Sequence, residues 1–356
     1  MIAESASATQ QLGRLHCLRA IAALGVLYHH LGQFSSTALG SSYGLPGSGL
    51  LWTGVDLFFV LSGFLMMWTT GQKPGGARES LSFLLTRSAR IYPMYWVTLL
   101  GTFLLAALFP GALPDGPQCD LLCQVTLLPE QDEFLIGPAW TLSFEMAFYV
   151  LFAALVLLPP QGRIRALAVW TLLVCTLGGL ITTQVMLVHH IYTPLVLEFL
   201  AGIWIAVLIR RGVRLQGWVI LIAAGVLLLS GAALFNAVSP SLPSGGAEWA
   251  RVALCGGPAS VIIWRLASQD TTAPLTPNRF MGKLGDDSYA IYLVHWPIIV
   301  VGSTIAPSWG IPTGMQFAAY LAMCLIGTFF LSGLLTKYIG FPTQKFAKLV
   351  TTHLKS

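Results

Sequence analysis

Long apolar runs recur along the whole chain, separated by short polar segments that are rich in glycine, proline and serine. A helix that crosses a bilayer needs about 20 mostly apolar residues. By that length the pattern predicts about ten spanning helices with loose boundaries. The predicted spans are residues 15–34, 50–70, 92–113, 138–158, 164–186, 192–209, 217–236, 249–268, 287–306 and 314–337.

Composition supports the same class of protein. Hydrophobic residues make up 55% of the chain and charged residues 9%, whereas soluble domains carry about 25% charged residues. We therefore predict an all-α, polytopic integral membrane protein with a single transmembrane domain over residues 1–356. A short polar stretch, residues 1–13, precedes the first span, a basic tail, residues 341–356, follows the last, and no soluble domain is appended.

The basic residues predict the orientation of the spans. With ten spans, every basic group except Arg251 falls on one side, and the acidic 114–137 loop falls on the other. Basic loops mark the cytoplasmic side of a membrane protein, so both termini are expected there. The net charge of +5 is thus an orientation signal and predicts no nucleic-acid partner. The inner groups are Arg14 and Arg19; Lys73, Arg78, Arg87 and Arg90; Arg163 and Arg165; Arg210, Arg211 and Arg214; Arg265, Arg279 and Lys283; and Lys337, Lys345, Lys348 and Lys355.

Ionisable residues inside the spans point to chemistry, since each costs about 2.5–3.5 kcal/mol to insert. This topology places His30, Asp56 and Glu145 at similar depths in the outer half. We predict that these three are catalytic, with His30 as the base that removes a proton from a hydroxyl group. Four further residues are predicted to contact an acceptor substrate: Trp140, Glu198, Arg251 and His295.

A second predicted group lies toward the inner face. Arg87 and Arg90 are three residues apart and share a helix face, and Arg19 and Lys283 lie at the same level. Together with Tyr92 they would suit a nucleotide phosphate, which arginine binds in bidentate fashion. Arg19 and His30 are eleven residues apart, which is about three helical turns or 16 Å along one face. The spacing suits a ligand with an anionic head and a long arm, such as coenzyme A.

Five segments carry a family resemblance in the same order as the spans: LHCLRAIAALGVLYHH (15–30), GVDLFFVLSGFL (54–65), RSARIYPMYW (87–96), PAWTLSFEMAFY (138–149) and DSYAIYLVHWP (287–297). They resemble motifs of the membrane-bound acyltransferase 3 family, and the LEFLAGIWIA run (197–206) resembles the exopolysaccharide-decorating branch. The resemblance implies an O-acyltransferase of the bacterial inner membrane. It would move an acyl group, expected to be acetyl, from cytoplasmic acyl-CoA to a hydroxyl of an extracytoplasmic carbohydrate.

Co-substrate and partners follow from that reading. Acyl-CoA is expected as a co-substrate, with no permanently bound cofactor. The expected partners are the carbohydrate acceptor, membrane lipid, and either polysaccharide synthesis or export machinery or a second copy of the chain. The cysteines lack metal-ligand spacing, so no metal site is predicted.

Several alternatives stay open at this point. Asp56 or Glu145 could orient His30, or Asp56 could form a structural ion pair with Arg251. The hydroxyl could attack the thioester directly, or through an acyl-histidine intermediate. A proton-coupled transporter or flippase would also use buried ionisable residues, and a non-catalytic subunit of an export complex is a third reading. Cys119 and Cys123 form either a local disulfide or two free thiols.

Overall fold

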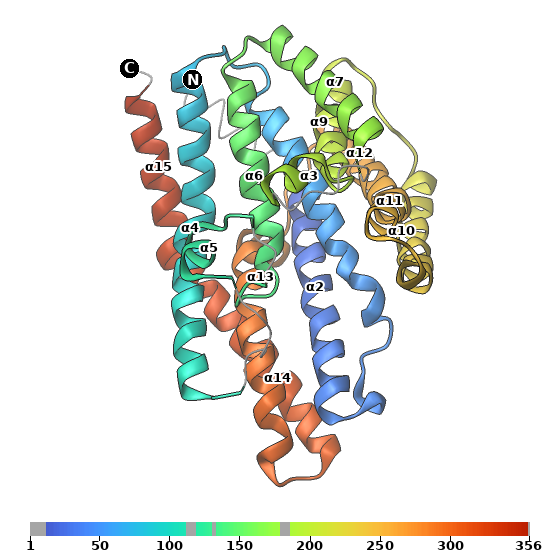
Figure 1. Ribbon diagram of the computed structural model, residues 1–356, viewed down its shortest axis with the longest axis vertical. Helices are drawn as coiled ribbons and strands as arrows, with labels where there is room; N and C mark the ends of the chain where they lie inside the picture. The colour runs from blue at the N-terminus through green and yellow to red at the C-terminus, as the bar shows by residue number, and fades with distance from the viewer. Residues whose placement is uncertain (1–11, 112–118, 130–132, 179–185, 355–356) are drawn as a thin grey trace. The chain divides into compact units, whose positions relative to one another are not determined.

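The computed structural model describes residues 12–111, 119–129, 133–178 and 186–354. Helices dominate these residues, and no β-strand occurs in the described ranges, as expected for an all-α chain (Figure 1). Asp115, Glu130, Asp132 and Lys355, which entered the orientation argument, lie outside the described residues, as does most of the 1–13 stretch. The long helices are α2 (Gly13–Leu39), α3 (Gly54–Thr70), α4 (Ala77–Leu108), α6 (Ala139–Val156), α7 (Pro160–Leu177), α9 (Val196–Arg210), α10 (Trp218–Val238), α12 (Gly257–Thr272), α13 (Arg279–Ile305), α14 (Thr313–Leu335) and α15 (Phe341–His353).

Seven helical stretches in the described ranges are long and apolar enough to cross a membrane, which makes the chain an integral membrane protein. They are Ser48–Thr70, Ala77–Leu108, Ala139–Val156, Trp218–Ser241, Gly245–Thr272, Arg279–Trp309 and Thr313–His353. Three other predicted spans correspond to α2, α7 and α9. The last of these has 15 residues, about 22 Å of helix. The count of ten and the cytoplasmic termini stay predictions.

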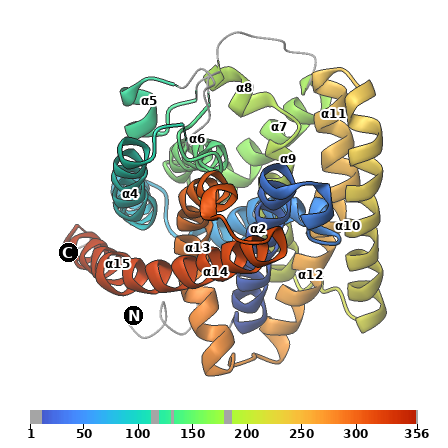
Figure 2. The same cartoon turned by 90° about the horizontal axis from the view of Figure 1, so that it is seen from below.

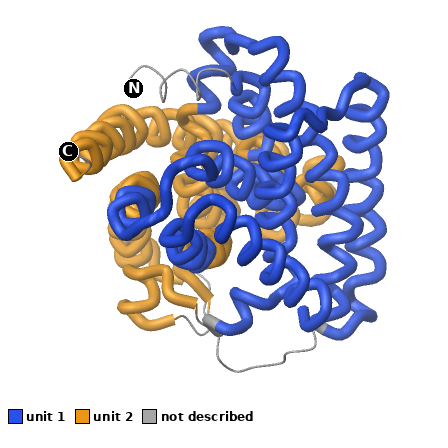
Figure 3. Tube along the Cα trace, turned by 90° about the horizontal axis from the view of Figure 1, so that it is seen from above, with its two compact units in different colours: residues 1–22, 53–83, 147–285 blue, residues 23–52, 84–146, 286–356 orange. Residues whose placement is uncertain are grey.

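The chain divides into two compact units (Figure 3). Unit 1 comprises residues 1–22, 53–83 and 147–285, and unit 2 comprises residues 23–52, 84–146 and 286–356. Four helices, α2, α4, α6 and α13, contribute residues to both units. Each unit is described below by itself.

In unit 1, α3 and α9 pack at close range through two glycines. A Cβ atom at Gly202 would lie 2.6 Å from the backbone nitrogen of Phe64, and one at Gly63 would lie 2.7 Å from the carbonyl carbon of Phe199. Helices in membranes commonly use small residues in this way, because their backbones can then approach closely. The contact brings together the two helices that carry Asp56 and Glu198.

Arg163 completes the ends of two helices in unit 1. Its side chain is fully buried. It donates hydrogen bonds to the carbonyl oxygens of Thr70 and Gly71 at the end of α3 and to that of Leu158 just after α6. The last carbonyls of a helix have no partner within the helix, and an arginine can supply several donors to them. The sequence predicted Arg163 only as an inner-side charge, so this capping role is new.

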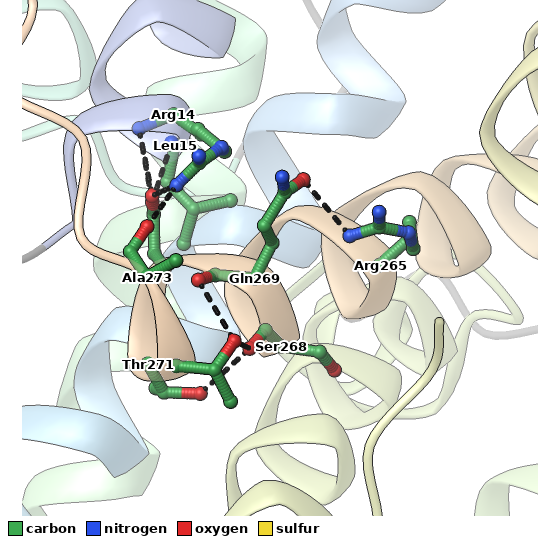
Figure 4. A network of polar contacts seen from close by, with 9 residues as sticks. Arg14, Leu15, Arg265, Ser268, Gln269, Thr271 and Ala273 are labelled. Atoms are coloured by element: carbon green, nitrogen blue, oxygen red, sulfur yellow. Dashed lines mark hydrogen bonds and ion pairs between the residues drawn. The ribbon is translucent and has the colours of Figure 1, made fainter. Parts of the chain in front are cut away.

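Asp270 holds the start of α2. Its carboxylate accepts hydrogen bonds from the backbone nitrogens of Arg14 and Leu15, at 2.9 and 3.2 Å, and pairs with the Arg14 guanidinium at 2.9 Å. Figure 4 labels Arg14 and Leu15 at this helix start. A carboxylate at a helix N-terminus satisfies unpaired N–H groups and the positive end of the helix dipole. Arg14 is thus a structural residue. The helix α12, which carries Asp270, lies beside α10, with α11 (Ser244–Arg251) next to them (Figure 2).

In unit 2, the short helix α5 (Leu121–Thr126) is held against α4 by three aromatic side chains. Tyr95 Oη, Trp96 Nε1 and Tyr92 Oη donate to the carbonyl oxygens of residues 124, 125 and 126 at 2.7, 2.8 and 2.7 Å. Tyr95 is fully buried, and its hydroxyl supplies the donor that a buried carbonyl oxygen requires. Cys119 forms a disulfide with Cys123 of α5, so the bridged alternative is the observed one.

The predicted basic tail is helical. Residues Phe341–His353 form α15, which lies beside α4 (Figure 1) and contacts it through a hydrogen bond from Thr343 Oγ1 to the carbonyl of Ala89 at 3.2 Å. The helix α13 also contacts α4, since Tyr289 Oη donates to the carbonyl of Ile91 at 3.0 Å. The Tyr289 bond links α13, which carries a predicted site residue, to α4.

Candidate active site

Two histidines from distant parts of the sequence meet in unit 2. Nδ1 of His30, on α2, lies 3.0 Å from Nε2 of His295, on α13. The two rings are stacked, with centroids 5.1 Å apart and planes 28° apart. His295 is fully buried, whereas His30 is half-buried. The pair therefore joins the predicted base to a residue predicted only as a substrate contact.

Hydrogen bonding determines which ring nitrogen of each histidine carries the proton. Nδ1 of His295 lies 2.9 Å from the carbonyl oxygen of Ile291, and a carbonyl can only accept, so this nitrogen carries hydrogen. A fully buried imidazole without a carboxylate partner is neutral, which makes its Nε2 an acceptor. His30 must then donate from Nδ1, and its Nε2 keeps a lone pair. No described residue forms a hydrogen bond with that nitrogen.

The residue next to His295 contributes a third ring. Trp296 contacts His30 edge-on, with centroids 5.1 Å apart, and Phe34 in the same manner at 5.3 Å. Gly137 makes room for the indole, since a Cβ there would lie 2.6 Å from Cη2 of Trp296. The buried indole nitrogen has no hydrogen-bond partner among the described residues. Sequence reasoning missed Trp296, although its place beside His295 in the HWP motif was a usable signal.

The helix α6 packs beside α13 and carries two predicted site residues. The hydroxyls of Thr141 and Tyr292 lie 2.7 Å apart, which ties the start of α6 to the middle of α13. Trp140 packs edge-on against Phe144 with ring centroids 5.9 Å apart. Glu145 is half-buried one helical turn further along. The described partner of His30 Nδ1 is His295 and not the predicted carboxylate, and the role of Glu145 stays a prediction.

Unit 1 holds a second buried polar cluster, formed by Asp56, Arg251 and Glu198. The guanidinium of Arg251 donates from Nε to one carboxylate oxygen of Asp56 at 3.0 Å and from Nη2 to the other at 3.4 Å. Asp56 is fully buried and Glu198 is 1% exposed. The ion pair foreseen as an alternative for Asp56 is thus present. Asp56 belongs to unit 1 and His30 to unit 2.

A wide helical turn shapes this cluster. Residues Val252–Gly256 form a π-helical turn, η4, between α11 and α12, directly after Arg251. Turns of this kind often occur at functional sites. A Cβ at Gly256 would lie 2.7 Å from Oε1 of Glu198, so the absence of a side chain admits that carboxyl group. Neither oxygen of Glu198 has a hydrogen-bond partner among the described residues.

The predicted phosphate-binding residues lie on three helices. Arg19 and His30 both belong to the continuous helix α2, so their separation is about 16 Å along its axis. Arg87, Arg90 and Tyr92 lie on the unit 2 part of α4 and are half-buried. Lys283 is exposed near the start of α13, in unit 1. No group of three or more metal-ligating side chains suited to a metal occurs among the described residues.

Comparison with known proteins defines the class. Residues 12–336 match the family model described as the acyltransferase domain of the acyltransferase 3 family, and the chain belongs to this family. It is a membrane-embedded O-acyltransferase.

Two relatives cover most of the chain. It is 30% identical to the exopolysaccharide production protein ExoZ of Rhizobium meliloti, over 77% of this chain and 85% of ExoZ. It is 29% identical to the acyltransferase MdmB of Streptomyces mycarofaciens, over 82% of this chain and 80% of MdmB. The putative membrane-bound transacylase BcsY of Komagataeibacter xylinus is 29% identical over 46% of this chain and 41% of BcsY. No solved structure matches.

Proposed function

We propose that this protein transfers an acetyl group from cytoplasmic acetyl-CoA to a hydroxyl group of an extracytoplasmic carbohydrate, such as an exopolysaccharide or lipid-linked glycan, in the bacterial inner membrane. The observation that carries the proposal is the contact of His30 Nδ1 with His295 Nε2 at 3.0 Å, which leaves Nε2 of His30 to accept a proton, on the same helix as Arg19. The similarity to ExoZ, a protein named for exopolysaccharide production, supports the choice of acceptor. Polysaccharide synthesis or export machinery, a second copy of the chain and membrane lipid are the proposed partners.

His30 acts as the general base in this proposal. Its Nε2 takes the proton of the acceptor hydroxyl while the oxygen attacks the thioester carbonyl carbon. The new C–O bond forms, the C–S bond breaks, and the CoA thiolate that leaves takes up the proton. The hydroxyl attacks the thioester directly, so no covalent acyl-enzyme is required. Asp56 and Glu145 are retained as candidate catalytic groups, and Trp140, Glu198 and Arg251 as candidate contacts of the acceptor.

The donor is proposed to lie along α2. Its phosphates would pair with Arg19, and its long arm would carry the thioester the three turns to His30. Arginine suits this task because its planar guanidinium binds phosphate through two parallel hydrogen bonds. Arg87, Arg90, Tyr92 and Lys283 are retained as candidate contacts of the donor.

The test uses the purified protein in nanodiscs with radiolabelled acetyl-CoA and an oligosaccharide acceptor. We expect His30→Ala to reduce label transfer by about 10²–10⁴-fold, the range contributed by a general base. Arg19→Ala should weaken acetyl-CoA binding by about tenfold or more, because a charged hydrogen bond contributes about 1.5–3 kcal/mol. Arg165→Ala, an exposed arginine on the α7 helix, is the matched control and should bind donor normally.

Three outcomes would contradict the proposal. Full turnover in His30→Ala would show that His30 is not the base. Equal donor affinity in Arg19→Ala and wild type would show that Arg19 does not bind the phosphates. Solute uptake into liposomes without cleavage of the thioester would favour a transporter instead.

A further inference from the structure

The histidine pair in unit 2 raises the question of which ring does the chemistry. Both nitrogens of His295 are engaged, Nδ1 with the carbonyl of Ile291 at 2.9 Å and Nε2 with His30 at 3.0 Å. Its ring is fully buried, so a substrate hydroxyl cannot reach it. His30 is half-buried, and the hydrogen bond of its ring among the described residues uses Nδ1, not Nε2. Only His30 can therefore contact the reacting atoms.

We infer that His295 is a positioning residue that fixes the tautomer of His30: it accepts the Nδ1 hydrogen and so leaves Nε2 as the proton acceptor. The inference rests on the proposed function, because it assigns a role to a neighbour of the proposed base. The chain of donors runs in one direction, from Nδ1 of His30 to Nε2 of His295 and from Nδ1 of His295 to the backbone of α13. Since the backbone carbonyl cannot donate, the direction of the whole chain is set.

The tautomer matters because the two forms of neutral histidine differ at the reacting nitrogen. With hydrogen on Nε2, His30 would present a donor to the acceptor hydroxyl and could not take its proton. When His30 does accept a proton at Nε2, its Nδ1–H continues to donate to His295, so the imidazolium keeps its partner through the reaction. Trp296 restrains the same ring from the side, with centroids 5.1 Å apart.

A neutral imidazole in this position differs from the carboxylate of a serine-protease triad. A carboxylate adds a full negative charge beside the base, whereas His295 contributes only an acceptor lone pair. The site therefore gains orientation without placing a further buried charge in the membrane, where a charge is costly. The arrangement needs no aspartate or glutamate within hydrogen-bond distance of His30.

The first measurement is the tautomer itself. In protein labelled with ¹⁵N-histidine, the ring signals lost in His30→Asn are those of His30. We expect them to show hydrogen on Nδ1 and a bare Nε2, the tautomer that is less common for imidazole free in water. A His30 ring with hydrogen on Nε2 would overturn the inference. This result is independent of activity and of any change at His295.

The second measurement separates orientation from packing. His295→Gln keeps an acceptor oxygen near the position of Nε2, so it should retain the wild-type tautomer of His30 and most of the turnover. His295→Phe keeps the bulk of the ring but removes the acceptor, and we expect kcat to fall about 10²-fold or more, with KM for acetyl-CoA unchanged. His29→Phe removes a neighbouring ring whose Nδ1 contacts the carbonyl of Ser48, and it is the matched control.

The outcomes distinguish this inference from the proposed function. If His30→Ala is inactive while His295→Phe turns over normally, His30 is the base and His295 is only structural. If His30→Ala is fully active, the base assignment fails whatever the tautomer. Should His295→Phe not fold, as judged by gel filtration and thermal unfolding, the ¹⁵N spectrum of the wild type and the His295→Gln variant still decide the question.

Discussion

Substituting Gly202 by alanine should separate two helices of unit 1. Gly202 lies on α9 against α3, and an added Cβ would be 2.6 Å from the backbone nitrogen of Phe64, with the carbonyl of Val60 closer still. Ordinary contacts begin at 3.4 Å, so the helices must move apart by about 0.8 Å or more. The obstacle is backbone, which cannot rotate away as a side chain would.

The magnitude follows from two opposing effects. Alanine is favoured over glycine in a helix by about 1 kcal/mol, whereas inserting a methyl into a packed interface costs about 1–3 kcal/mol. A gap of 0.5–1 Å also forfeits a quarter to a half of each contact energy. The stacked rings of Phe59 and Phe199, whose centroids are 4.6 Å apart, span this interface and would lose contact. With the lost ring contact added, we expect a net destabilisation of about 1–2 kcal/mol.

Thermal unfolding in detergent, followed by tryptophan fluorescence, measures the effect. Gly225→Ala, on α10, is the matched control, because nothing lies within 4 Å of a Cβ at that position and only the gain in helix propensity remains. Gly202→Ala should unfold several degrees below Gly225→Ala. Equal unfolding temperatures for the two variants would refute the claim that backbone contact sets the spacing of α3 and α9.

Three further predictions follow from buried contacts. Arg163→Met should lower the free energy of unfolding by at least about 3 kcal/mol, because each buried carbonyl left without a donor costs about 1–3 kcal/mol; Arg163→Lys should rescue little of this in the same unfolding assay. Arg251→Leu should lower the free energy of unfolding by about 3–5 kcal/mol, because it leaves Asp56 charged and unpaired. The Arg251→Leu/Asp56→Asn double variant should recover part of that loss. If the loss in the double variant equals the sum of the losses in the two single variants, the pairing is contradicted. Replacing Cys119 and Cys123 by serine should lower the free energy of unfolding by about 2 kcal/mol, the loop-closure value for so short a loop. Wild-type protein treated with a reductant should lose the same stability.

The helices and much of the chemistry could be predicted from the sequence, because apolar runs and costly charges are local signals. The Arg19 and His30 spacing follows from helix geometry alone, and α2 carries both residues. The pairing of Asp56 with Arg251 was foreseen as an alternative, since an isolated outer-side cation needs a partner. Such features depend on one segment or on the balance of charge.

Other features depend on which segments meet, and the sequence alone does not contain that register. His295 lies 265 positions from His30, and only tertiary packing makes it the neighbour of Nδ1. Arg163 reads as an ordinary inner-side arginine until the ends of α3 and α6 are seen around it. Asp270 reads as a polar residue at a helix end, although it holds the first turn of α2.

The direction in which Arg251 points depends on the one extra residue in the π-helical turn η4. A turn of this kind contains one more residue than an α-helical turn, and one residue corresponds to about 100° of rotation. Deleting one residue between Val252 and Gly256 would restore a regular helix and swing Arg251 by that angle relative to α12. Along this stretch, insertions and deletions would therefore alter the chemistry more than most substitutions, so length is the property to compare among relatives.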